Sequence, residues 1–187
     1  MSLIHKKVSP FHVHAYQNDQ FIEVTEQDLL GHWSVIVFYP ADFTFVCPTE
    51  LGDLAENYEA FKKINCEVYS VSTDSHFTHK AWHDESDTVR QVQYPMLGDP
   101  GAVLARDFDV LAEKDWQALR GSFVINPEGE IVAYEVNDTS IGRDSSELLR
   151  KVEAAQFVAE NGDQVCPARW RPGEKTLKPG YDLVGKI

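Results

Sequence analysis

Cys47 is the residue best placed for chemistry, because it lies between an apolar strand and the predicted start of a helix. Residues 35–39 form a continuous apolar run rich in β-branched and aromatic side chains, which is typical of a strand buried on both faces. Pro48 and Glu50 suit a first helical turn, where a missing N–H costs nothing and a negative charge meets the positive end of the dipole. Free backbone N–H groups at such a position stabilise a thiolate, so we expect Cys47 to be a reactive nucleophile and not simply a small buried apolar residue.

Four further residues could assist this thiol. Pro40 fixes and shields the preceding loop and offers no competing N–H. The hydroxyl of Thr44 can donate and accept, so it can hold a bound oxygen near the sulfur. Arg120 begins a later strand, and we expect a parallel sheet to bring its positive charge beside the start of the Cys47 helix; Arg143 is the second candidate. The alternative for either arginine is a surface ion pair.

The charge balance and the cysteines limit the possible functions. Acidic residues outnumber basic residues 30 to 17, giving a net charge of −13, which disfavours nucleic acids and anionic membrane surfaces as partners. No stretch has the length of a membrane span or the apolar core of a signal peptide, so we expect a cytoplasmic protein. The three cysteines, at positions 47, 66 and 166, form neither closely spaced ligand pairs nor a disulfide framework. We interpret Cys66 as a buried structural thiol.

Hydrophobic periodicity predicts an α/β protein with a thioredoxin-like fold: a central mixed β-sheet flanked by helices, an N-terminal β-hairpin at one end of the sheet and an extended C-terminal arm. A strand, a helix and a second strand form a βαβ unit with a parallel pair. We assign residues 1–161 to the folded domain and 162–187 to the arm, which carries Cys166. The expected strands cover residues 11–16, 21–24, 35–39, 67–72, 94–101 (a short edge strand with turns), 120–125 and 130–136, and the expected helices residues 47–64, 74–85, 102–108 and 144–160.

Several motifs, in the same order and along essentially the whole chain, resemble those of the typical two-cysteine peroxiredoxins. They read YPADFTFVCPTE at residues 39–50, DSHFTHKAW at 74–82, RGSF at 120–123 and VCPA at 165–168. Within that family the resemblance is greatest to the bacterial alkyl hydroperoxide reductase branch. It implies a thiol-dependent peroxidase that uses neither a metal nor another cofactor.

The resemblance also implies roles for the residues of the motifs. Cys47 would attack the O–O bond of a hydroperoxide and become a sulfenic acid, which Cys166 would resolve as a disulfide. Thr44 and Arg120 would position the peroxide and stabilise the departing oxygen, and Pro40 would shield them. The positions of the two cysteines alone fit an intrachain or an interchain bond equally well, whereas the resemblance implies the interchain bond.

Supporting residues and partners follow from the same resemblance. Glu50 and Arg143 would belong to the hydrogen-bond network of the site. Two antiparallel subunits would form a dimer and five dimers a decamer, with Phe77, Thr78 and Trp82 at or near the contact between dimers. The alternative for Phe77 and Trp82 is that they pack within their own subunit. The electron donor would be a flavoprotein NADH-dependent disulfide reductase, or a thioredoxin in its place.

Two other functions and one other site are possible. A thiol–disulfide exchange protein on the same fold is disfavoured, because such proteins typically use Cys-x-x-Cys and the chain has Glu50 at the second position. A holdase-like oligomer has no direct support in the sequence. His76, His79 and His83 fall on one face of a predicted helix with a spacing typical of metal ligands, but without a fourth ligand nearby we expect a solvated or interface face.

Overall fold

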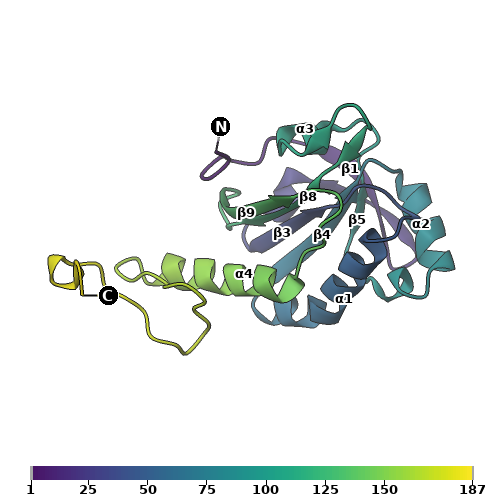
Figure 1. Cartoon of the computed structure of the whole chain (residues 1–187). Helices are drawn as coiled ribbons and strands as arrows, with labels where there is room; N and C mark the ends of the chain where they lie inside the picture. Colours follow the sequence, from purple (N-terminus) through teal and green to yellow (C-terminus); the bar gives the residue numbers. More distant parts are fainter. Residues whose placement is uncertain (1, 187) are drawn as a thin grey trace.

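A seven-stranded mixed β-sheet with helices against it forms the body of the protein in this computed structural model, which describes residues 2–186 (Figure 1). The spatial order is β2-β1-β5-β4-β3-β8-β9. This arrangement confirms the predicted central mixed sheet and the N-terminal hairpin. The strands are β1 His12–Gln17, β2 Gln20–Thr25, β3 Trp33–Phe38, β4 Cys66–Ser72, β5 Met96–Gly98, β8 Arg120–Ile125 and β9 Ile131–Asn137, with a separate ribbon of β6 Leu111–Ala112 and β7 Gln117–Ala118. The α-helices are α1 Cys47–Lys63, α2 His76–Glu85, α3 Val103–Asp107 and α4 Ser145–Glu160, and the 3-10 turns are η1 Glu26–Leu29, η2 Val89–Gln91 and η3 Tyr181–Leu183.

The junction between β3 and α1 forms where the sequence predicted it. All six residues of β3 are buried, in keeping with its apolar run, and the strand lies between β4 and β8. Helix α1 begins at Cys47 with Pro48 in its first turn. Its last turn contains Lys62 and Lys63, where positive charge suits the negative end of the dipole.

Two apolar cores, one on each face of the sheet, hold this junction in place. On one face α1 contributes Leu51 and Phe61, both fully buried, to a cluster that includes Cys47 itself. On the other face Phe38 packs against Phe108, with ring centroids 5.2 Å apart. Burying a side chain of this size stabilises the fold by roughly 1.5–3 kcal/mol, so β3 is fixed from both sides.

The prediction that residues 94–101 form an edge strand is wrong. Strand β5 lies inside the sheet, parallel to β4 and antiparallel to β1. The N-terminal hairpin of β1 and β2 covers the outer side of β5 and becomes the edge in its place. The shortness of the strand and the prolines beside it indicated an edge, but Pro95 precedes the strand, and its carbonyl accepts a hydrogen bond from the Ser70 N–H at 3.1 Å.

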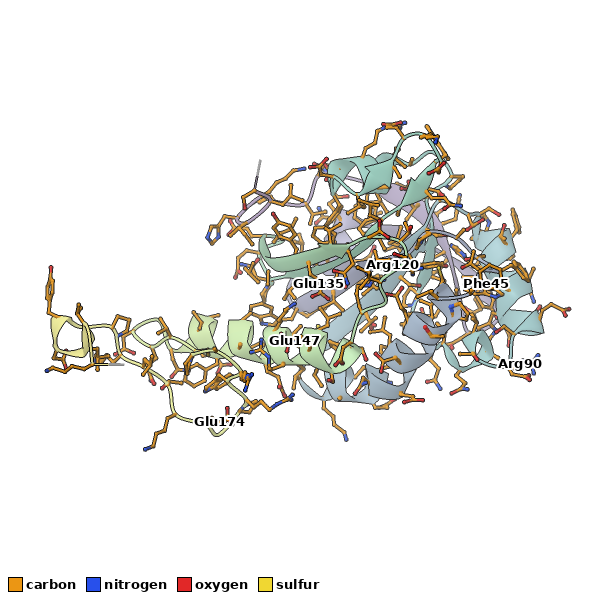
Figure 2. The ribbon with its side chains drawn as sticks, viewed as in Figure 1. Phe45, Arg90, Arg120, Glu135, Glu147 and Glu174 are labelled. Carbon is orange, nitrogen blue, oxygen red and sulfur yellow. The ribbon has the colours of Figure 1, made fainter. Side chains whose placement is uncertain are left out.

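The segment after α4 leaves the body of the protein as an extended arm (Figure 1). Val165 and Leu177 pair in an isolated antiparallel bridge, and Trp170 is 3% exposed, packed against Phe157 of α4 at 4.9 Å between ring centroids. Figure 2 shows Glu174 on this arm, below α4, and Arg120 within the body. Among residues 2–186, no helix has the length and apolar character to cross a membrane.

Candidate active site

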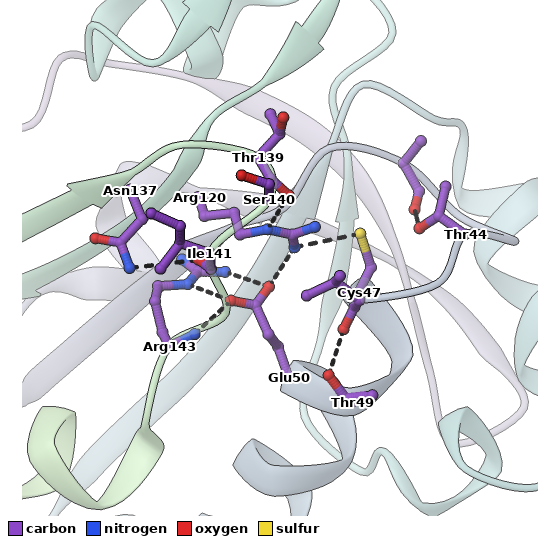
Figure 3. A network of polar contacts seen from close by, with 12 residues as sticks. Thr44, Cys47, Thr49, Glu50, Arg120, Asn137, Thr139, Ser140, Ile141 and Arg143 are labelled. Carbon is purple, nitrogen blue, oxygen red and sulfur yellow. Dashed lines mark hydrogen bonds and ion pairs between the residues drawn. The ribbon is translucent and has the colours of Figure 1, made fainter.

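Cys47 lies at the first residue of α1, and its side chain is 1% exposed (Figure 3). Its Sγ is 3.5 Å from Nη1 of Arg120, which donates a hydrogen bond to it. The positive end of the α1 dipole and a guanidinium therefore lie beside the same sulfur, an arrangement typical of nucleophilic cysteines. The expected position of the thiol at a helix start is confirmed.

Arg120 reaches this sulfur for a different reason from the one the sequence suggested. Strand β8 runs antiparallel to β3, with Val37 opposite Ser122, so the expectation of a parallel pair is wrong. In an antiparallel pair the start of one strand lies beside the end of the other. Arg120 begins β8 and therefore lies beside the end of β3, where the chain turns toward α1. A parallel β8 would have placed it at the opposite end of the sheet.

Glu50 joins both arginines of the site in one buried ion network. Its Oε2 accepts from Arg120 Nη1 at 2.6 Å and from Arg143 Nη2 at 2.9 Å, and its Oε1 accepts from Arg143 Nε at 2.8 Å (Figure 3). Burial works to raise the pKa of Glu50, but the hydrogen bonds and charges of Arg143 and then Arg120 outweigh it, so the pKa lies below its ordinary value. Glu50 is thus held as a carboxylate and orients the guanidinium that touches Cys47.

Backbone carbonyls also accept hydrogen bonds from the two arginines. Arg120 Nε donates to the carbonyl of Thr139 at 2.7 Å, and Arg143 Nη1 donates to that of Gly121 at 2.7 Å. The alternative of surface ion pairs is therefore wrong, since both arginine side chains are about 95% buried. Nothing in the sequence indicated Thr139, because a carbonyl acceptor depends on the path of the chain and not on residue type.

Pro40 and Thr44 lie on the loop between β3 and α1, as expected. Pro40 is buried, and the Thr44 hydroxyl donates to the carbonyl of Ala41 at 2.8 Å. Because its proton is already used, the Thr44 oxygen is left with lone pairs that accept a hydrogen bond from a ligand. Phe45 is 93% exposed and projects from the same loop (Figure 2).

Residues 4–134 match the family model described as AhpC/TSA family. The chain belongs to this family. Residues 154–186 match the model of the C-terminal domain of 1-Cys peroxiredoxin. The chain is 57% identical to the alkyl hydroperoxide reductase C of Salmonella typhimurium and 56% identical to that of Bacillus subtilis, in both cases over 187 residues and the whole of both chains.

Solved structures of peroxiredoxins also match the fold of this chain. The crystal structure of Enterococcus faecalis AhpC matches with a TM-score of 0.87 at 55% identity, over 89% of this chain and all of the other. The reduced 2-Cys peroxiredoxin of Plasmodium vivax matches with a TM-score of 0.92 at 31% identity, over 97% and 96% of the two chains. The predicted thioredoxin-like peroxiredoxin fold is confirmed. The protein is a peroxiredoxin, a thiol-dependent peroxidase of antioxidant defence, and the exchange-protein alternative is not favoured.

Cys166 of this peroxiredoxin lies at the other end of the sheet from Cys47. It lines a groove of about 570 Å³ whose wall includes Trp33 and Arg150, and its Sγ contacts the Ala154 carbonyl at 3.8 Å. Burial raises the pKa of Cys166, and the charge of Arg150 partly offsets this. Trp33 begins β3 and Cys47 lies beyond its end, so the two cysteines lie toward opposite ends of a strand whose six residues span roughly 16 Å.

The third cysteine has the structural role expected of it. Cys66 begins β4, is 2% exposed, and belongs to the core cluster on the α1 side of the sheet. Burial raises its pKa, which keeps the thiol neutral. Cys66 is therefore a poor nucleophile, and Cys47 and Cys166 remain as the reactive candidates.

The three α2 residues expected at a subunit contact differ in exposure. Phe77 is 63% exposed, and Thr78 lies in the first turn, with its hydroxyl 2.9 Å from the Ser75 hydroxyl that caps the helix. Trp82 is only 3% exposed and packs between Tyr39 and Phe43, with ring centroids 6.1 and 5.9 Å away. Trp82 thus supports the active-site loop of its own subunit, while Phe77 remains open to a partner.

The expectation of a solvated or interface histidine face on α2 is wrong for His79. Its side chain is fully buried, with Nδ1 2.7 Å from Asp42 and Nε2 3.0 Å from the Leu97 carbonyl. His83 is half-buried beside the Tyr16 hydroxyl at 3.2 Å. The sequence missed Asp42 because a buried acid on a loop has no periodic pattern. Within residues 2–186, no three His, Cys, Asp or Glu residues are arranged to hold a metal ion.

Proposed function

We propose that this peroxiredoxin reduces hydrogen peroxide and organic hydroperoxides to water and alcohols through a sulfenic acid on Cys47. The 3.5 Å contact between Cys47 Sγ and Arg120 Nη1 carries the proposal, because it places a fixed positive charge beside the sulfur at a helix start. Glu50 and Arg143 support this role by holding the Arg120 guanidinium in place. Such a site serves a reaction in which a thiolate attacks and an oxygen anion leaves.

The first step transfers one oxygen to the sulfur. The Cys47 thiolate attacks the terminal oxygen of the hydroperoxide, an S–O bond forms and the O–O bond breaks, and the hydroxide or alkoxide that leaves takes up a proton. Arg120 stabilises the negative charge on the departing oxygen, and the lone pairs of Thr44 accept the hydroperoxide O–H. Pro40, buried on the same loop, excludes water from the sulfur.

Cys166 resolves the sulfenic acid in the second step. Its thiolate attacks the Cys47 sulfur, the S–S bond forms and hydroxide leaves. The Cα atoms of a disulfide lie within about 4.4–6.8 Å, and the length of β3 separates the two thiols of one chain. This separation favours a bond between Cys47 of one subunit and Cys166 of another, in an antiparallel homodimer.

The assembly and the electron donor complete the proposal. We infer that five dimers form a decamer, with the exposed Phe77 and the neighbouring Thr78 at the contact between dimers and Trp82 supporting it from within. Residues 1–161 would act as the catalytic domain and 162–187 as the resolving arm. The donor would be a flavoprotein NADH-dependent disulfide reductase, or a thioredoxin, in the cytoplasm. The relatives named alkyl hydroperoxide reductase C support this choice.

Peroxide consumption with dithiothreitol as the reductant tests the proposal. We expect Cys47→Ser to consume peroxide no faster than dithiothreitol alone, because Cys166 lacks the helix start and the arginine. Cys166→Ser should still consume peroxide, because dithiothreitol reduces the sulfenic acid directly, but should form no disulfide-linked dimer.

Cys66→Ala is the matched control, since Cys66 is as buried as Cys47 but lies outside the site. It should retain the wild-type rate. Full peroxide reduction by Cys47→Ser would contradict the proposal. Reduction of insulin disulfides at a rate comparable with peroxide reduction would favour the exchange-protein alternative instead.

A further inference from the structure

A buried chain of polar side chains lies directly behind the active-site loop. Asp42, on that loop, accepts a 2.7 Å hydrogen bond from the Tyr39 hydroxyl through Oδ1, and its Oδ2 is 2.7 Å from His79 Nδ1. The other nitrogen of His79, Nε2, is 3.0 Å from the carbonyl of Leu97 on β5. The side chains of His79 and Asp42 are 0% and 1% exposed. None of these groups touches the reacting sulfur.

The hydrogen-bond partners of His79 assign the proton on one of its two ring nitrogens. A carbonyl only accepts, so Nε2 of His79 carries a proton that it donates to Leu97. The 2.7 Å contact between Nδ1 and Asp42 holds a second proton, on one partner or the other. Either arrangement leaves the pair without net charge, which burial favours. Burial also raises the pKa of Tyr39, so its hydroxyl remains a donor to Asp42.

This chain ties the loop to the rest of the fold at several points. The backbone N–H of Asp42 donates to the Asp74 carboxylate at 2.8 Å, which also accepts from the Ser72 hydroxyl at 2.9 Å at the end of β4. The next residue, Phe43, has a left-handed backbone with φ of 54°, a conformation that costs about 1 kcal/mol or more for a residue with a side chain. The loop therefore adopts this path because contacts with β4, β5 and α2 hold it there.

We propose that His79 is a positioning residue, whose hydrogen bonds to Asp42 and Leu97 hold the loop of residues 40–46 closed so that Cys47 stays at the helix start. The inference rests on the proposed function. Cys47 is 1% exposed in the closed loop, so a thiol from another subunit reaches it only when the loop opens. The reaction with peroxide needs the closed loop and disulfide formation needs the open one. Loosening the His79 contacts should therefore slow the first step and accelerate the second.

His79→Leu tests whether the rates of the two steps change in opposite directions. It removes both hydrogen bonds and leaves the buried Asp42 carboxyl with the Tyr39 hydroxyl but without the imidazole, a change that alters a closed–open equilibrium by a factor of about ten. Both steps are followed by acid quench and intact mass, the first as oxidation of Cys47 by hydrogen peroxide and the second as conversion of the sulfenic acid to the disulfide. We expect the second rate to rise by up to about tenfold, as the open fraction does, and the first rate to fall by a smaller factor, because the wild-type loop is predominantly closed.

His83→Leu is the matched control on the same helix. His83 contacts the hydroxyl of Tyr16 and the carbonyl of Val92, both at 3.2 Å, but it does not touch the loop. His79 likewise has a tyrosine hydroxyl, that of Tyr39, 3.3 Å from Nδ1, and a carbonyl, that of Leu97, at Nε2. His83→Leu should change both rates little and in the same direction. If His79→Leu changes both rates in the same proportion, or neither, the positioning role is overturned.

A milder variant covers the case in which His79→Leu does not fold. Tyr39→Phe removes only the hydroxyl that donates to Asp42 and keeps the ring that packs on Trp82. Like His79→Leu, it should slow the oxidation of Cys47 and accelerate disulfide formation, but by smaller factors. Rates equal to those of the wild type would overturn the proposal. A wild-type protein that fails to oxidise Cys47 with peroxide would instead refute the proposed function, so the two failures are distinguishable.

Discussion

At the scale of single residues, the site depends on a carboxylate that never touches the sulfur. Glu50 is 6% exposed and accepts hydrogen bonds from both Arg120 and Arg143. Two buried guanidinium groups without this partner would repel one another, and each would lose its orientation. Glu50 therefore makes it possible to hold a positive charge against Cys47 inside the protein.

The ion network predicts how stability depends on pH. The pKa of Glu50 in the folded protein lies below its ordinary value of 4.5, so its contribution is fully present above that value and is lost as the pH falls through the folded pKa. Glu50→Gln should lower the free energy of unfolding by about 2 kcal/mol at pH 7. The difference from the wild type should narrow at an acidic pH below 4.5, as the pH falls through the lowered pKa of Glu50 and the carboxylate becomes protonated. Urea unfolding at both pH values measures it.

Glu113→Gln provides the control for this prediction. Glu113 also pairs with an arginine, Arg106, but its side chain is 65% exposed. An exposed pair of this kind contributes about 0–1 kcal/mol, so the control should unfold almost like the wild type at both pH values. A Glu50→Gln protein with an unchanged unfolding free energy at pH 7 would show that the buried network does not stabilise the fold.

At the scale of helices and strands, the sequence predicts what local signals determine. The β3–α1 junction was predicted because an apolar run, a proline and an acid are adjacent in the chain. The direction of β8 was not, because an antiparallel neighbour depends on the path of the chain between distant strands. The burial of His79 was missed for the same reason, since its partner Asp42 lies 37 positions away. Residue types and the family resemblance identified the catalytic candidates and the supporting Glu50 and Arg143, whereas the Thr139 carbonyl and the contact between Asp42 and His79 required the structure.

The arm behaves as an element attached at one main point. Trp170 packs on Phe157, and its backbone carbonyl accepts from Arg150 Nη1 at 3.2 Å. Trp170→Ala should release the segment around Cys166 without unfolding the sheet, because local contacts determine local opening. Limited proteolysis should then cut the arm several times faster, while the thermal midpoint of the body changes little.

Tyr181→Ala is the matched control on the same arm. Tyr181 is an aromatic residue too, but it is 99% exposed and contributes no buried surface. Its proteolysis rate should equal that of the wild type. An arm that is cut no faster after Trp170→Ala would mean that the contact with α4 does not hold it.

At the scale of the whole molecule, the two thiols lie at opposite ends of one sheet. Cys47 follows the end of β3, and the groove of Cys166 includes Trp33 at its start. The sheet is rigid because both of its faces are packed, so it cannot shorten to bring the two sulfurs of one chain together. The antiparallel dimer proposed above would resolve this, since it would place the arm end of one subunit beside the thiol end of the other.

Mixed subunits test this arrangement directly. Cys47→Ser subunits, enlarged by a tag, are co-expressed with untagged Cys166→Ser subunits and treated with hydrogen peroxide. An interchain bond predicts a disulfide-linked band at the summed mass on a non-reducing gel, since only the untagged subunit supplies Cys47 and only the tagged one supplies Cys166. Neither variant alone should give a linked dimer, and the background Cys66→Ala should change nothing. If the wild type is instead oxidised to a monomer and the mixture stays unlinked, the bond is intrachain, and the arm must move along the length of β3 to form it.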